Sequence, residues 1–368
     1  MSAHALRRTP LFEAHLAGGA RMVDFGGWEM PLHYGSQLKE HESVRRDAGM
    51  FDVSHMLAID IEGSEATAFL RTMLANDVAR LTLDGRALYA CMLREDGGIL
   101  DDLIVYRRDG ARYRLVVNAG TAQRDVAWLG DHAPRFAVRL EARRDLAIVA
   151  IQGPHARERL WSARPTWTDA ASTLKSFQAV ELGSTFLACT GYTGEDGFEI
   201  LLPADDVRAL WNDLIAAGVQ PCGLGARDSL RLEAGMALYG EDMDVKVTPV
   251  EAGLGWTLAD ADVARDYIGR TALNRRLPRF RTLGLVLLDK GVLRAHQRTR
   301  GVGGAGETTS GGFAPTLQRS IALARLPCES APGDDVEVEI RDKWLRARVV
   351  NYPFVRRGAA LLPPLPPV

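Results

Sequence analysis

Two neighbouring carboxylates in the segment GGILDDLIVY, residues 97–106, are the side chains of this sequence best placed for chemistry. Asp101 and Asp102 follow the turn signal Asp96-Gly97 and lie in an apolar run that predicts a β-strand. Successive side chains of a strand point to opposite faces, so each carboxylate joins a different, largely apolar face. Ionising a buried carboxylate without a partner is costly, which makes at least one of them a candidate for proton or cation chemistry. An equal alternative is a strand-end aspartate that binds backbone amides.

A second candidate lies in TGYTGEDGFE, residues 190–199, which contains three glycines and two aromatic residues. The glycines permit a backbone that turns tightly or approaches a ligand closely. Glu199 lies just past this loop, at the start of an apolar strand. Its carboxylate is suited to accept two parallel hydrogen bonds from an amide-plus-amine edge, such as that of a pterin ring. The pattern alone favours the competing interpretation, a tight hairpin with an edge glutamate.

The third candidate is an arginine in CGLGARDSLRLEAGM, residues 222–236, a glycine-rich turn that opens a helix. Arg227 falls in the first turn of this helix, where a positive charge opposes the helix dipole. That unfavourable position indicates that the guanidinium is held for another partner, a carboxylate or a ligand. A salt bridge to Asp228 or Glu233 is an equally good explanation.

The elements around the two aspartates predict a mixed architecture. Residues 88–118 read as a three-stranded meander joined by Asp-Gly turns. Helical periodicity follows over residues 119–133. A strand over residues 146–153 then precedes a helix over residues 154–163. Strands and helices recur in this irregular order, which indicates an α+β fold rather than a repeating βα unit.

The chain changes character near residues 275–281. Short strand-like runs separated by Gly/Pro turns follow, which predicts a small antiparallel barrel or sandwich. The tail LLPPLPP is expected to be extended, because proline continues neither a helix nor a central strand. The strand-like runs are residues 282–288, 320–326, 335–340 and 346–350.

Composition and charge exclude several classes of protein. The 368 residues suffice for two or three domains, and 46% hydrophobic with 25% charged residues is ordinary for a globular protein. A formal net charge of −2 argues against a general nucleic-acid binder. No apolar run is long enough to span a bilayer, and the N-terminal segment lacks the apolar core of a secretory signal. We therefore expect no membrane association and no cleaved peptide.

The cysteines and histidines give no sign of a metal site. The four cysteines form no CxxC pair, and the eight histidines are dispersed without the spacing of a zinc site. Isolated cysteines fit a reducing, cytoplasmic setting. A Walker loop, a GxSxG elbow and a dinucleotide-binding GxGxxG are also missing.

Many segments occur in the same order as in a known family. They begin with TPLFEAHLAGGARMVDFGGWEMPLHYGS and VRRDAGMFDVSHM, followed by LANDVARL, ALYACML, GGILDDLIVY, LVVNAGT and AIQGP. They continue with TGYTGEDGFEI, CGLGARDSLRLEAGMALYGEDMD and PVEAGLGW, then YIGRTAL, KGVLR, TSGGFAPTL and SIALARLP. On these motifs the chain resembles the glycine cleavage T-protein family of aminomethyltransferases over nearly its whole length. MFDVSHM and GLGARDSLRLEAG are the most specific of them.

The resemblance implies a tetrahydrofolate-dependent transferase of glycine catabolism. Its partner would be the H-protein, a small lipoyl carrier loaded with an aminomethyl group. Tetrahydrofolate would be the acceptor substrate for the one-carbon unit, and transfer would release ammonia and give methylenetetrahydrofolate. We expect a bacterial cytoplasmic enzyme, monomeric as is the default in the family.

The same resemblance assigns roles to individual residues. Asp102 would be the catalytic carboxylate, with Asp101 as its structural neighbour. Glu199 would hold the pterin edge, and Arg227 would lie in the same folate pocket. Weaker assignments as pocket lining are Tyr89, Asn118, Tyr192 and Met56.

The fold implied by the family is an α+β cloverleaf of three domains around a central folate channel. Two interleaved α+β folate-binding domains would occupy residues 1–275, one of them containing roughly residues 55–140. A C-terminal antiparallel β-barrel would follow over residues 280–358, and then a Pro-rich tail over residues 359–368.

Two features depart from the family pattern. Residues 298–312 are shorter and richer in glycine than the usual hairpin, and Ala314 and Gln318 stand where the family usually has serine and glycine. Both departures fall in the expected barrel, so they bear on its loop geometry and on carrier docking.

Two other functions are compatible with a folate-binding fold of this kind. A folate-linked demethylation module would normally be fused to a flavin domain, whose dinucleotide-binding segment is missing here. A folate-binding iron–sulfur maintenance protein without transferase turnover would carry a KGCxxGQE-type motif. The corresponding segment here, ALYGEDMDVKVTPVE, has no cysteine and is similar to the transferase version.

Overall fold

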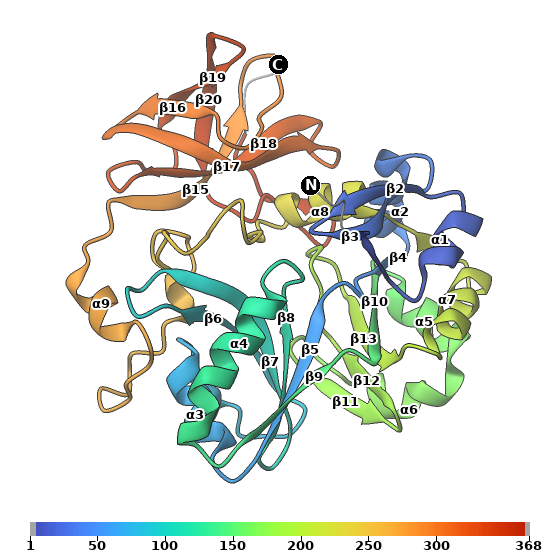
Figure 1. Cartoon of the computed structure of the whole chain (residues 1–368). Coiled ribbons are helices and arrows are strands. Elements are labelled where there is room, and N and C mark those ends of the chain that lie inside the picture. The colour runs from blue at the N-terminus through green and yellow to red at the C-terminus, as the bar shows by residue number, and fades with distance from the viewer. Residues whose placement is uncertain (1–4, 365–368) are drawn as a thin grey trace.

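The computed structural model describes residues 5–364, so residues 1–4 and the end of the predicted Pro-rich tail, residues 365–368, lie outside the described part. A five-stranded sheet, a six-stranded sheet with a small N-terminal sheet, and a closed barrel surround the middle of the molecule (Figure 1). This arrangement confirms the predicted α+β fold with a C-terminal antiparallel barrel. No helix among residues 5–364 is both long and apolar enough to cross a membrane.

The five-stranded sheet carries the two neighbouring aspartates. Its strands follow the order β6-β7-β8-β5-β9, and every neighbouring pair is antiparallel. The meander predicted over residues 88–118 is β6, β7 and β8, and its turns place Gly97 and Gly110 at positive φ, 84° and 41°. The strands are β5 (Leu57–Glu62), β6 (Ala87–Leu93), β7 (Ile99–Asp109), β8 (Arg112–Val117) and β9 (Arg139–Arg143).

Helices α3 (Ala66–Met73) and α4 (Ala122–His132) pack on one face of this sheet. The predicted helix over residues 119–133 is therefore confirmed as α4, and its Leu129 is fully buried in one core with Leu103 of β7. The opposite face of the sheet packs against the six-stranded sheet, where Tyr106 contacts Phe186 edge-on at 5.1 Å between ring centroids. The two aspartates of β7 therefore face two different environments.

The six-stranded sheet has the order β11-β12-β13-β10-β4-β14, with helices α5 and α7 on its outer side (Figure 1). Helix α5 begins at Ala156, two residues later than predicted, because Gly153 and Pro154 lie in a turn closed by Ala156 N and Gly153 O at 3.1 Å. The elements are β4 (Gly49–Asp52), β10 (Leu146–Gln152), α5 (Ala156–Ala163), α6 (Thr168–Ala171), β11 (Ala179–Leu182), β12 (Thr185–Ala188), β13 (Gly197–Pro203), α7 (Val207–Ala216) and β14 (Gln220–Pro221).

The N-terminal elements lie beside this sheet and contact helix α8 (Leu224–Glu233). Their three-stranded sheet has the order β1-β3-β2, and the sequence patterns had predicted none of its strands. The elements are β1 (Arg7–Arg8), α1 (Phe12–Ala17), β2 (Arg21–Phe25), β3 (Trp28–His33) and α2 (Gln37–Arg46).

The C-terminal region is a closed barrel, which decides between the predicted barrel and sandwich. Its order is β15-β18-β17-β16-β19-β20, and β16 with β17 form a hairpin inside the glycine-rich segment 298–312. Helix α9 (Arg270–Arg275) precedes the barrel, and β21 (Val355–Arg356) pairs with β22 (Ala359–Ala360) after it. The barrel strands are β15 (Phe280–Leu287), β16 (Arg298–Gly301), β17 (Gly304–Ala314), β18 (Arg319–Pro327), β19 (Asp335–Ile340) and β20 (Lys343–Val350).

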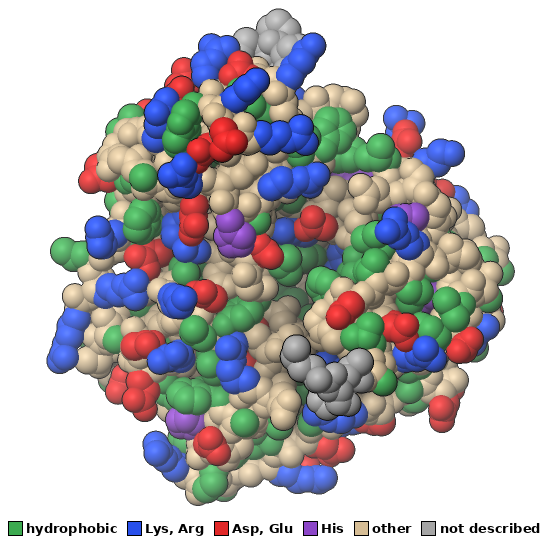
Figure 2. All heavy atoms as spheres, turned by 45° about the horizontal axis from the view of Figure 1, so that its top comes forward, with side chains coloured by type: hydrophobic (Ala, Val, Ile, Leu, Met, Phe, Trp, Pro, Cys, Tyr) green, Lys and Arg blue, Asp and Glu red, His purple; other side chains and the backbone are tan. Residues whose placement is uncertain are grey.

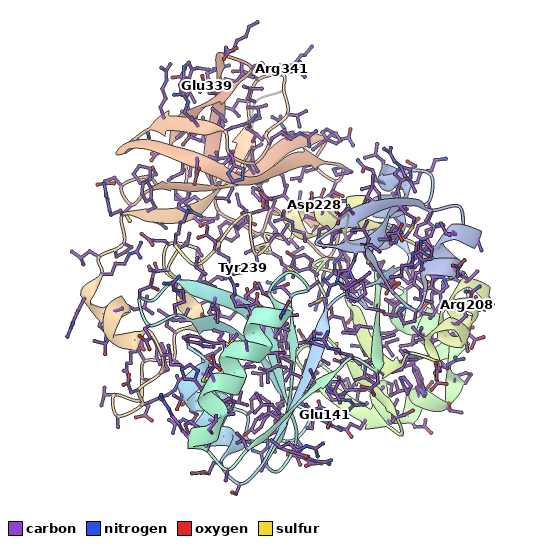
Figure 3. The ribbon with its side chains drawn as sticks, viewed as in Figure 1. Glu141, Arg208, Asp228, Tyr239, Glu339 and Arg341 are labelled. Carbon is purple, nitrogen blue, oxygen red and sulfur yellow. The ribbon has the colours of Figure 1, made fainter. Side chains whose placement is uncertain are left out.

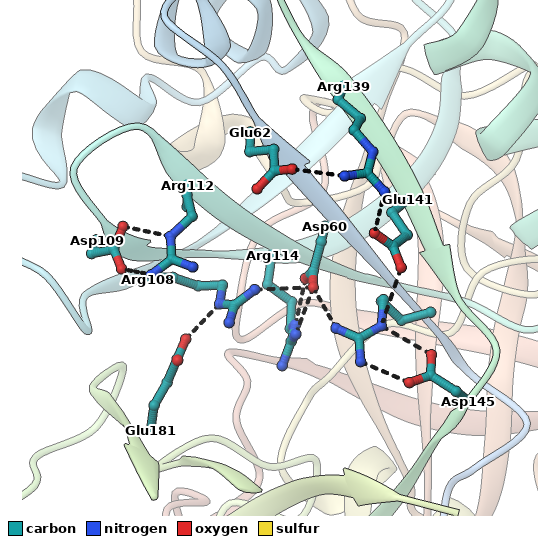
Figure 4. Close-up of polar contacts among 11 residues, drawn as sticks. Asp60, Glu62, Arg108, Asp109, Arg112, Arg114, Arg139, Glu141, Asp145 and Glu181 are labelled. Atoms are coloured by element: carbon teal, nitrogen blue, oxygen red, sulfur yellow. Dashed lines mark hydrogen bonds and ion pairs between the residues drawn. The ribbon is translucent and has the colours of Figure 1, made fainter. Parts of the chain in front are cut away.

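An ion-pair network around Asp60 joins the strands of the five-stranded sheet and does not include Asp101 or Asp102 (Figure 4). Asp60 on β5 accepts hydrogen bonds from Arg114 at 2.6 and 2.7 Å, from Arg108 at 3.0 Å and from Arg143 at 2.8 Å. Arg108 also binds Glu181 on β11, which joins this sheet to the six-stranded one. Because the partners come from β5, β7, β8, β9 and β11, the network helps to fix how these strands align.

Candidate functional site

A cavity of about 1400 Å³ lies where the three groups of elements meet. Figure 2 shows a hollow in the middle of one face, bordered by hydrophobic side chains, with basic side chains gathered on the barrel beside it. The cavity wall is drawn from residues between Val23 and Tyr352. Figure 3 shows two of its residues, Asp228 and Tyr239, between the barrel and the other sheets. Ligand pockets for a drug-sized molecule are typically about 300–1,000 Å³, so this cavity exceeds the needs of one such molecule.

Aromatic side chains form an apolar mouth to the cavity. Phe25, Phe177 and Phe313 line it and are exposed, and Trp256 is 65% exposed. Phe25 lies on β2, Phe177 in the loop before β11, Phe313 on β17 and Trp256 in a 3₁₀ helix, Gly255–Thr257. Exposed apolar groups gathered at a cavity mouth mark an interaction site more often than an ordinary surface.

Asp102 lies on the cavity wall, on the β7 face that looks toward the six-stranded sheet. Its Oδ2 accepts a hydrogen bond from the Tyr89 hydroxyl at 2.8 Å, and its Oδ1 accepts one from Asn118 Nδ2 at 3.0 Å. Burial, and after it the charge of Asp101, raise the pKa of Asp102 to about 7. A carboxyl group with that pKa exchanges protons readily near neutral pH.

Asp101 takes the other face of β7, as the strand alternation predicted, and is fully buried. Its Oδ2 accepts from the backbone N–H of Asn118 at 3.2 Å, and its Oδ1 accepts from Asn118 Nδ2 at 2.9 Å. Both interpretations of the aspartate pair therefore describe the molecule. Asp101 is the strand-end aspartate that binds a backbone amide, and Asp102 is the one that opens to the cavity.

Glu199 also lines the cavity, from the third residue of β13. Because β13 lies between β12 and β10, the interpretation as an edge glutamate is wrong. Its Oε2 accepts from Thr190 Oγ1 at 2.6 Å, and that hydroxyl contacts the hydroxyl of Tyr106 at 2.9 Å. The carboxylate is thus held at one oxygen and retains acceptor capacity for a ligand.

Arg227 lines the cavity from the first part of α8. The alternative prediction, a salt bridge from Arg227 to Asp228 or Glu233, is wrong, because both carboxylates pair with other arginines. Asp228 pairs with Arg231 at 2.8 Å, and Glu233 pairs with Arg45 at 2.8 Å. The Arg227 guanidinium lies 4.8 Å from the ring centroid of Tyr192, and burial lowers its pKa. Its Nη1 is buried without an acceptor in the described part of the chain. A buried donor without a partner is costly, so a ligand acceptor at this position would be favourable.

The remaining predicted residues are also brought together here. Tyr192 and Met56 line the cavity, and the Tyr192 hydroxyl donates to Ala237 O. Tyr89 stacks on Trp256 with 5.6 Å between ring centroids. The structure therefore gathers all seven predicted site residues around one cavity: Asp102, Glu199, Arg227, Tyr89, Asn118, Tyr192 and Met56.

Several cavity residues were not predicted from the sequence. His55 lines the cavity, its Nδ1 is buried without a hydrogen-bond partner among residues 5–364, and burial lowers its pKa to about 4. Trp256 lies in a three-residue 3₁₀ helix and Tyr239 in a loop with one isolated bridge to Met243, so no periodicity marks either residue. His55 and Trp256 do fall inside quoted motifs, MFDVSHM and PVEAGLGW, so the motifs were the available signal. No group of three His, Cys, Asp or Glu side chains in the described residues is arranged to hold a metal ion.

Comparisons with known families and proteins agree over nearly the whole chain. The family model GCVT N-terminal domain matches residues 11–261, and the glycine cleavage T-protein C-terminal barrel domain matches residues 281–356. An aminomethyltransferase of Bordetella parapertussis is 59% identical over 360 residues, covering 97% of this chain and 98% of that protein. An aminomethyltransferase of Nitrosomonas eutropha is 56% identical over 365 residues, covering 97% of this chain and 100% of that protein.

A solved structure has the same fold. The crystal structure of glycine cleavage system aminomethyltransferase T from Bartonella henselae is 37% identical, with a TM-score of 0.89. The match covers 96% of this chain and 99% of the other.

Proposed function

The chain belongs to the glycine cleavage T-protein family and is an aminomethyltransferase, and from this premise we propose the reaction and the residues that perform it. The aminomethyl group would arrive on the lipoyl arm of a carrier, the H-protein, as a sulfur–CH₂–NH₂ unit. Tetrahydrofolate would take the carbon between its N5 and N10 atoms. The observation that carries the proposal is the geometry of one cavity: Asp102, held by Tyr89 and Asn118, lines it together with Glu199 and Arg227.

The reaction balances without an oxidant or reductant. The carbon–sulfur and carbon–nitrogen bonds break, and two carbon–nitrogen bonds form to the folate. The two hydrogens lost from N5 and N10 pass to sulfur and to the departing amine. The products are the lipoyl thiol, ammonia and methylenetetrahydrofolate.

Asp102 would have two roles in this transfer: it would stabilise a developing positive charge and accept a proton. Breaking a bond at the aminomethyl carbon develops an iminium-like cation, and a fixed carboxylate in a water-poor site stabilises it. The same carboxylate can accept the proton of the attacking nitrogen. Tyr89 and Asn118 occupy one oxygen each, at 2.8 and 3.0 Å, which orients the group.

Glu199 and Arg227 would hold the pterin ring. A carboxylate pairs with an amide-plus-amine edge through two parallel hydrogen bonds. The unpartnered Nη1 of Arg227 would then donate to the carbonyl oxygen beside that edge. Thr190 and Tyr106 fix Glu199 from behind, which favours a single orientation of the ring.

The size and the apolar mouth of the cavity support binding of a second substrate, one that is attached to a carrier protein. Its volume of about 1400 Å³ leaves room for a lipoyl arm beside a pterin. Phe25, Phe177 and Phe313 offer apolar surface where that arm or its carrier would enter. A single chain forms the whole cavity wall, so we expect the monomer to be active. The four cysteines are free, in keeping with the reducing cytoplasm in which we place the enzyme.

The decisive experiment measures ammonia release from aminomethylated H-protein with and without tetrahydrofolate. Wild type should show folate-stimulated release, and Asp102→Asn should lose about two to four orders of magnitude in rate. Calorimetry should show that Asp102→Asn still binds tetrahydrofolate. Glu141→Gln, which removes an exposed carboxylate at the far end of the five-stranded sheet (Figure 3), is the control and should behave as wild type.

Each other outcome contradicts part of the proposal. Near-normal turnover in Asp102→Asn would remove that residue from the catalytic role. Folate binding without stimulated ammonia release in wild type would instead favour a folate-binding protein without transferase turnover.

A further inference from the structure

His55 is a cavity residue to which the proposed reaction gives no role. It lines the cavity and is 7% exposed. Its Nδ1 is buried without a hydrogen-bond partner among residues 5–364, and its Nε2 has no partner there either. Buried polar groups normally have a partner, so an unpartnered one on a cavity wall points to a ligand.

The other histidines of the described chain differ from His55 in this respect. The two that are also buried, His15 and His41, each use both ring nitrogens. The exposed or half-buried ones each have at least one polar contact: His33, His132, His155 and His296. Among residues 5–364, the fold therefore satisfies every buried imidazole except the one on the cavity wall.

A fixed loop after β4 presents the His55 ring to the cavity. The preceding residue, Ser54, is tied to β10, because its Oγ accepts from Ile148 N at 3.0 Å and donates to Ile148 O at 3.2 Å. The imidazole packs edge-on against Phe25, with 5.5 Å between ring centroids and 86° between ring planes. The ring is thus held before any ligand arrives, which lowers the entropic cost of a contact.

His55 lies beside the residues proposed to hold the pterin. Strand β4 pairs with β10, and β10 with β13, in a register that aligns Phe51 and Glu199 in one row across the sheet. The Arg227 guanidinium lies 5.9 Å from the ring centroid of Phe51. His55 follows Phe51 by four residues, and its ring contacts Phe25 at the cavity mouth. A ligand that extends from the pterin site toward the mouth would therefore pass this ring.

The protonation of His55 defines what it can bind. Burial lowers the pKa of His55 to about 4, so the imidazole is neutral near neutral pH and has one N–H and one lone pair. A buried N–H without an acceptor is rarer than a buried acceptor without a donor, so the enclosed Nδ1 takes the lone pair. The proton then resides on Nε2, the nitrogen left to donate to a ligand.

Both substrates of the proposed reaction carry a matching acceptor at a distance from their reacting ends. Tetrahydrofolate has an amide between its aminobenzoyl ring and its glutamate, and the lipoyl arm has an amide that joins it to a lysine of the carrier. An uncharged carbonyl oxygen suits an uncharged N–H, because neither partner buries a charge. A carboxylate would instead be matched by a cation such as an arginine.

We propose that His55 is a substrate-binding residue whose Nε2–H donates to the carbonyl oxygen of a substrate amide between the pterin site and the mouth. The inference rests on the proposed function, which supplies the two amide-bearing substrates. Such a bond makes the site selective, because an analogue without the amide leaves the buried N–H unpaired.

Three substitutions at position 55 separate hydrogen bonding from packing. In His55→Gln the side-chain amide reaches the position of Nε2 and keeps a donor there, whereas the shorter side chain of His55→Asn reaches only the position of Nδ1. His55→Phe keeps an aromatic ring against Phe25 and has no hydrogen-bonding group. His55→Phe and His55→Asn should bind the amide-bearing substrate about 5- to 50-fold more weakly than wild type, and His55→Gln should stay within about threefold.

Two measurements identify which substrate supplies the amide. Calorimetry gives the Kd of tetrahydrofolate and of 6-methyltetrahydropterin, which has the reduced pterin but no aminobenzoyl amide. If folate supplies the amide, His55→Phe and His55→Asn weaken binding of tetrahydrofolate alone. If the lipoyl arm supplies it, both Kd values stay unchanged and KM for aminomethylated H-protein rises by the same factor, with kcat retained. His155→Asn, at an exposed histidine outside the cavity wall, is the control and should change none of these values.

Thermal unfolding distinguishes a binding role from a structural one. His55→Phe removes a buried polar group that has no partner in the described chain, so its melting temperature should hold or rise. Wild-type Kd and KM values in His55→Phe would overturn the inference, as would equal losses in His55→Gln and His55→Asn. Weaker binding of both pterins together with a lower melting temperature would show a structural role and overturn it too.

The inference and the proposed function can fail separately. If the wild-type protein binds tetrahydrofolate but shows no folate-stimulated ammonia release, the proposed function fails, while weakened folate binding in His55→Phe still supports the role of His55. If ammonia release is normal but neither substrate is affected by His55→Phe, the proposed function stands and the inference fails.

Discussion

Tyr89 and Asp102 are joined across two neighbouring strands, with the Tyr89 hydroxyl donating to Asp102 Oδ2 at 2.8 Å. The Tyr89 ring is itself held by Trp256, stacked at 5.6 Å between centroids and 20° between ring planes. The Tyr89 hydroxyl restricts the Asp102 carboxylate to one orientation, and the Trp256 ring in turn restricts the Tyr89 ring. The direction of the Asp102 carboxylate is therefore set partly by residue 256, from a different part of the chain.

Removing that phenol should change the pH dependence of the enzyme. The hydrogen bond from Tyr89 lowers the pKa of Asp102, so Tyr89→Phe should raise it. We expect the acidic limb of kcat to move to higher pH by about one pH unit. Tyr113→Phe is the matched control, because its buried hydroxyl contacts Thr67 at 2.7 Å in the same domain but away from the cavity. Equal profiles for the two variants would contradict the orienting role of Tyr89.

The raised pKa of Asp102 also predicts a cost in stability. A carboxyl group that binds its proton more tightly in the folded chain destabilises the fold once it ionises. This penalty is absent below the pKa of the unfolded chain, grows as pH rises, and is complete above about pH 7. Asp102→Asn should therefore be more stable than wild type above that pH by roughly 2–4 kcal/mol in urea unfolding, with no difference near pH 4. A constant difference across this range would contradict it.

Below its pKa, Asp102 is protonated and can no longer act as a base. Turnover should consequently fall as the pH drops through about 7. A pH series of ammonia release at saturating substrates measures this directly, and a flat profile from pH 5 to 8 would count against the assignment. The ionised form, which the proposed mechanism requires, is thus the form of Asp102 that lowers the stability of the fold.

Two adjacent arginines on α2 should differ strongly in their contribution to stability. Arg45 binds Glu233 at 2.8 Å and Glu195 at 2.6 Å, and all three side chains are buried. Arg45→Ala leaves a buried charge uncompensated and should cost about 3–5 kcal/mol of unfolding free energy. Arg46 pairs with Glu42 on the surface, so Arg46→Ala should cost at most about 1 kcal/mol. Similar losses in chemical denaturation would refute the distinction.

Arg227 should be needed for the ligand rather than for the fold. Arg227→Met keeps much of the volume but removes the donor left unpartnered at Nη1. Tetrahydrofolate binding by calorimetry should weaken by about 10- to 100-fold, while thermal stability holds or rises. Arg208→Met, on the outer side of α7 (Figure 3), should change neither. A variant at position 227 that loses stability but binds normally would contradict this interpretation.

Local patterns were sufficient for the parts of the fold built from neighbouring residues. The meander around Asp102 has strong Asp-Gly turns and apolar strands, so its order and the opposite facing of Asp101 and Asp102 followed from the sequence. Helix α4 followed from its periodicity. The hairpin β16–β17 did not, because glycines leave no alternation of side chains to detect.

The prediction of the candidate site depended on the family's sequence motifs rather than on local hydrophobic periodicity. Nothing local indicates that Glu199 lies in an interior strand, since that depends on β10 and β12 pairing on either side of it. Asp125 reads as an ordinary first-turn acidic residue of a helix. Burial raises the pKa of Asp125, and that burial arises only when α4 folds against the five-stranded sheet. Contacts of this kind connect distant segments, and no window of sequence contains them.

The cavity wall is complete only after nearly the whole chain has been synthesised, because its lining residues extend from Val23 to Tyr352. Helix α8 is joined to the barrel through Glu233, which accepts from the backbone and hydroxyl of Thr316 at 2.8 and 2.7 Å, and the wall is completed near Tyr352. A chain still on the ribosome exposes Asp102 long before those residues have been made. We therefore expect that the nascent protein cannot enclose a ligand in this cavity until the barrel has folded onto α8, and that a prematurely terminated chain does not compete with the full-length enzyme for its substrates.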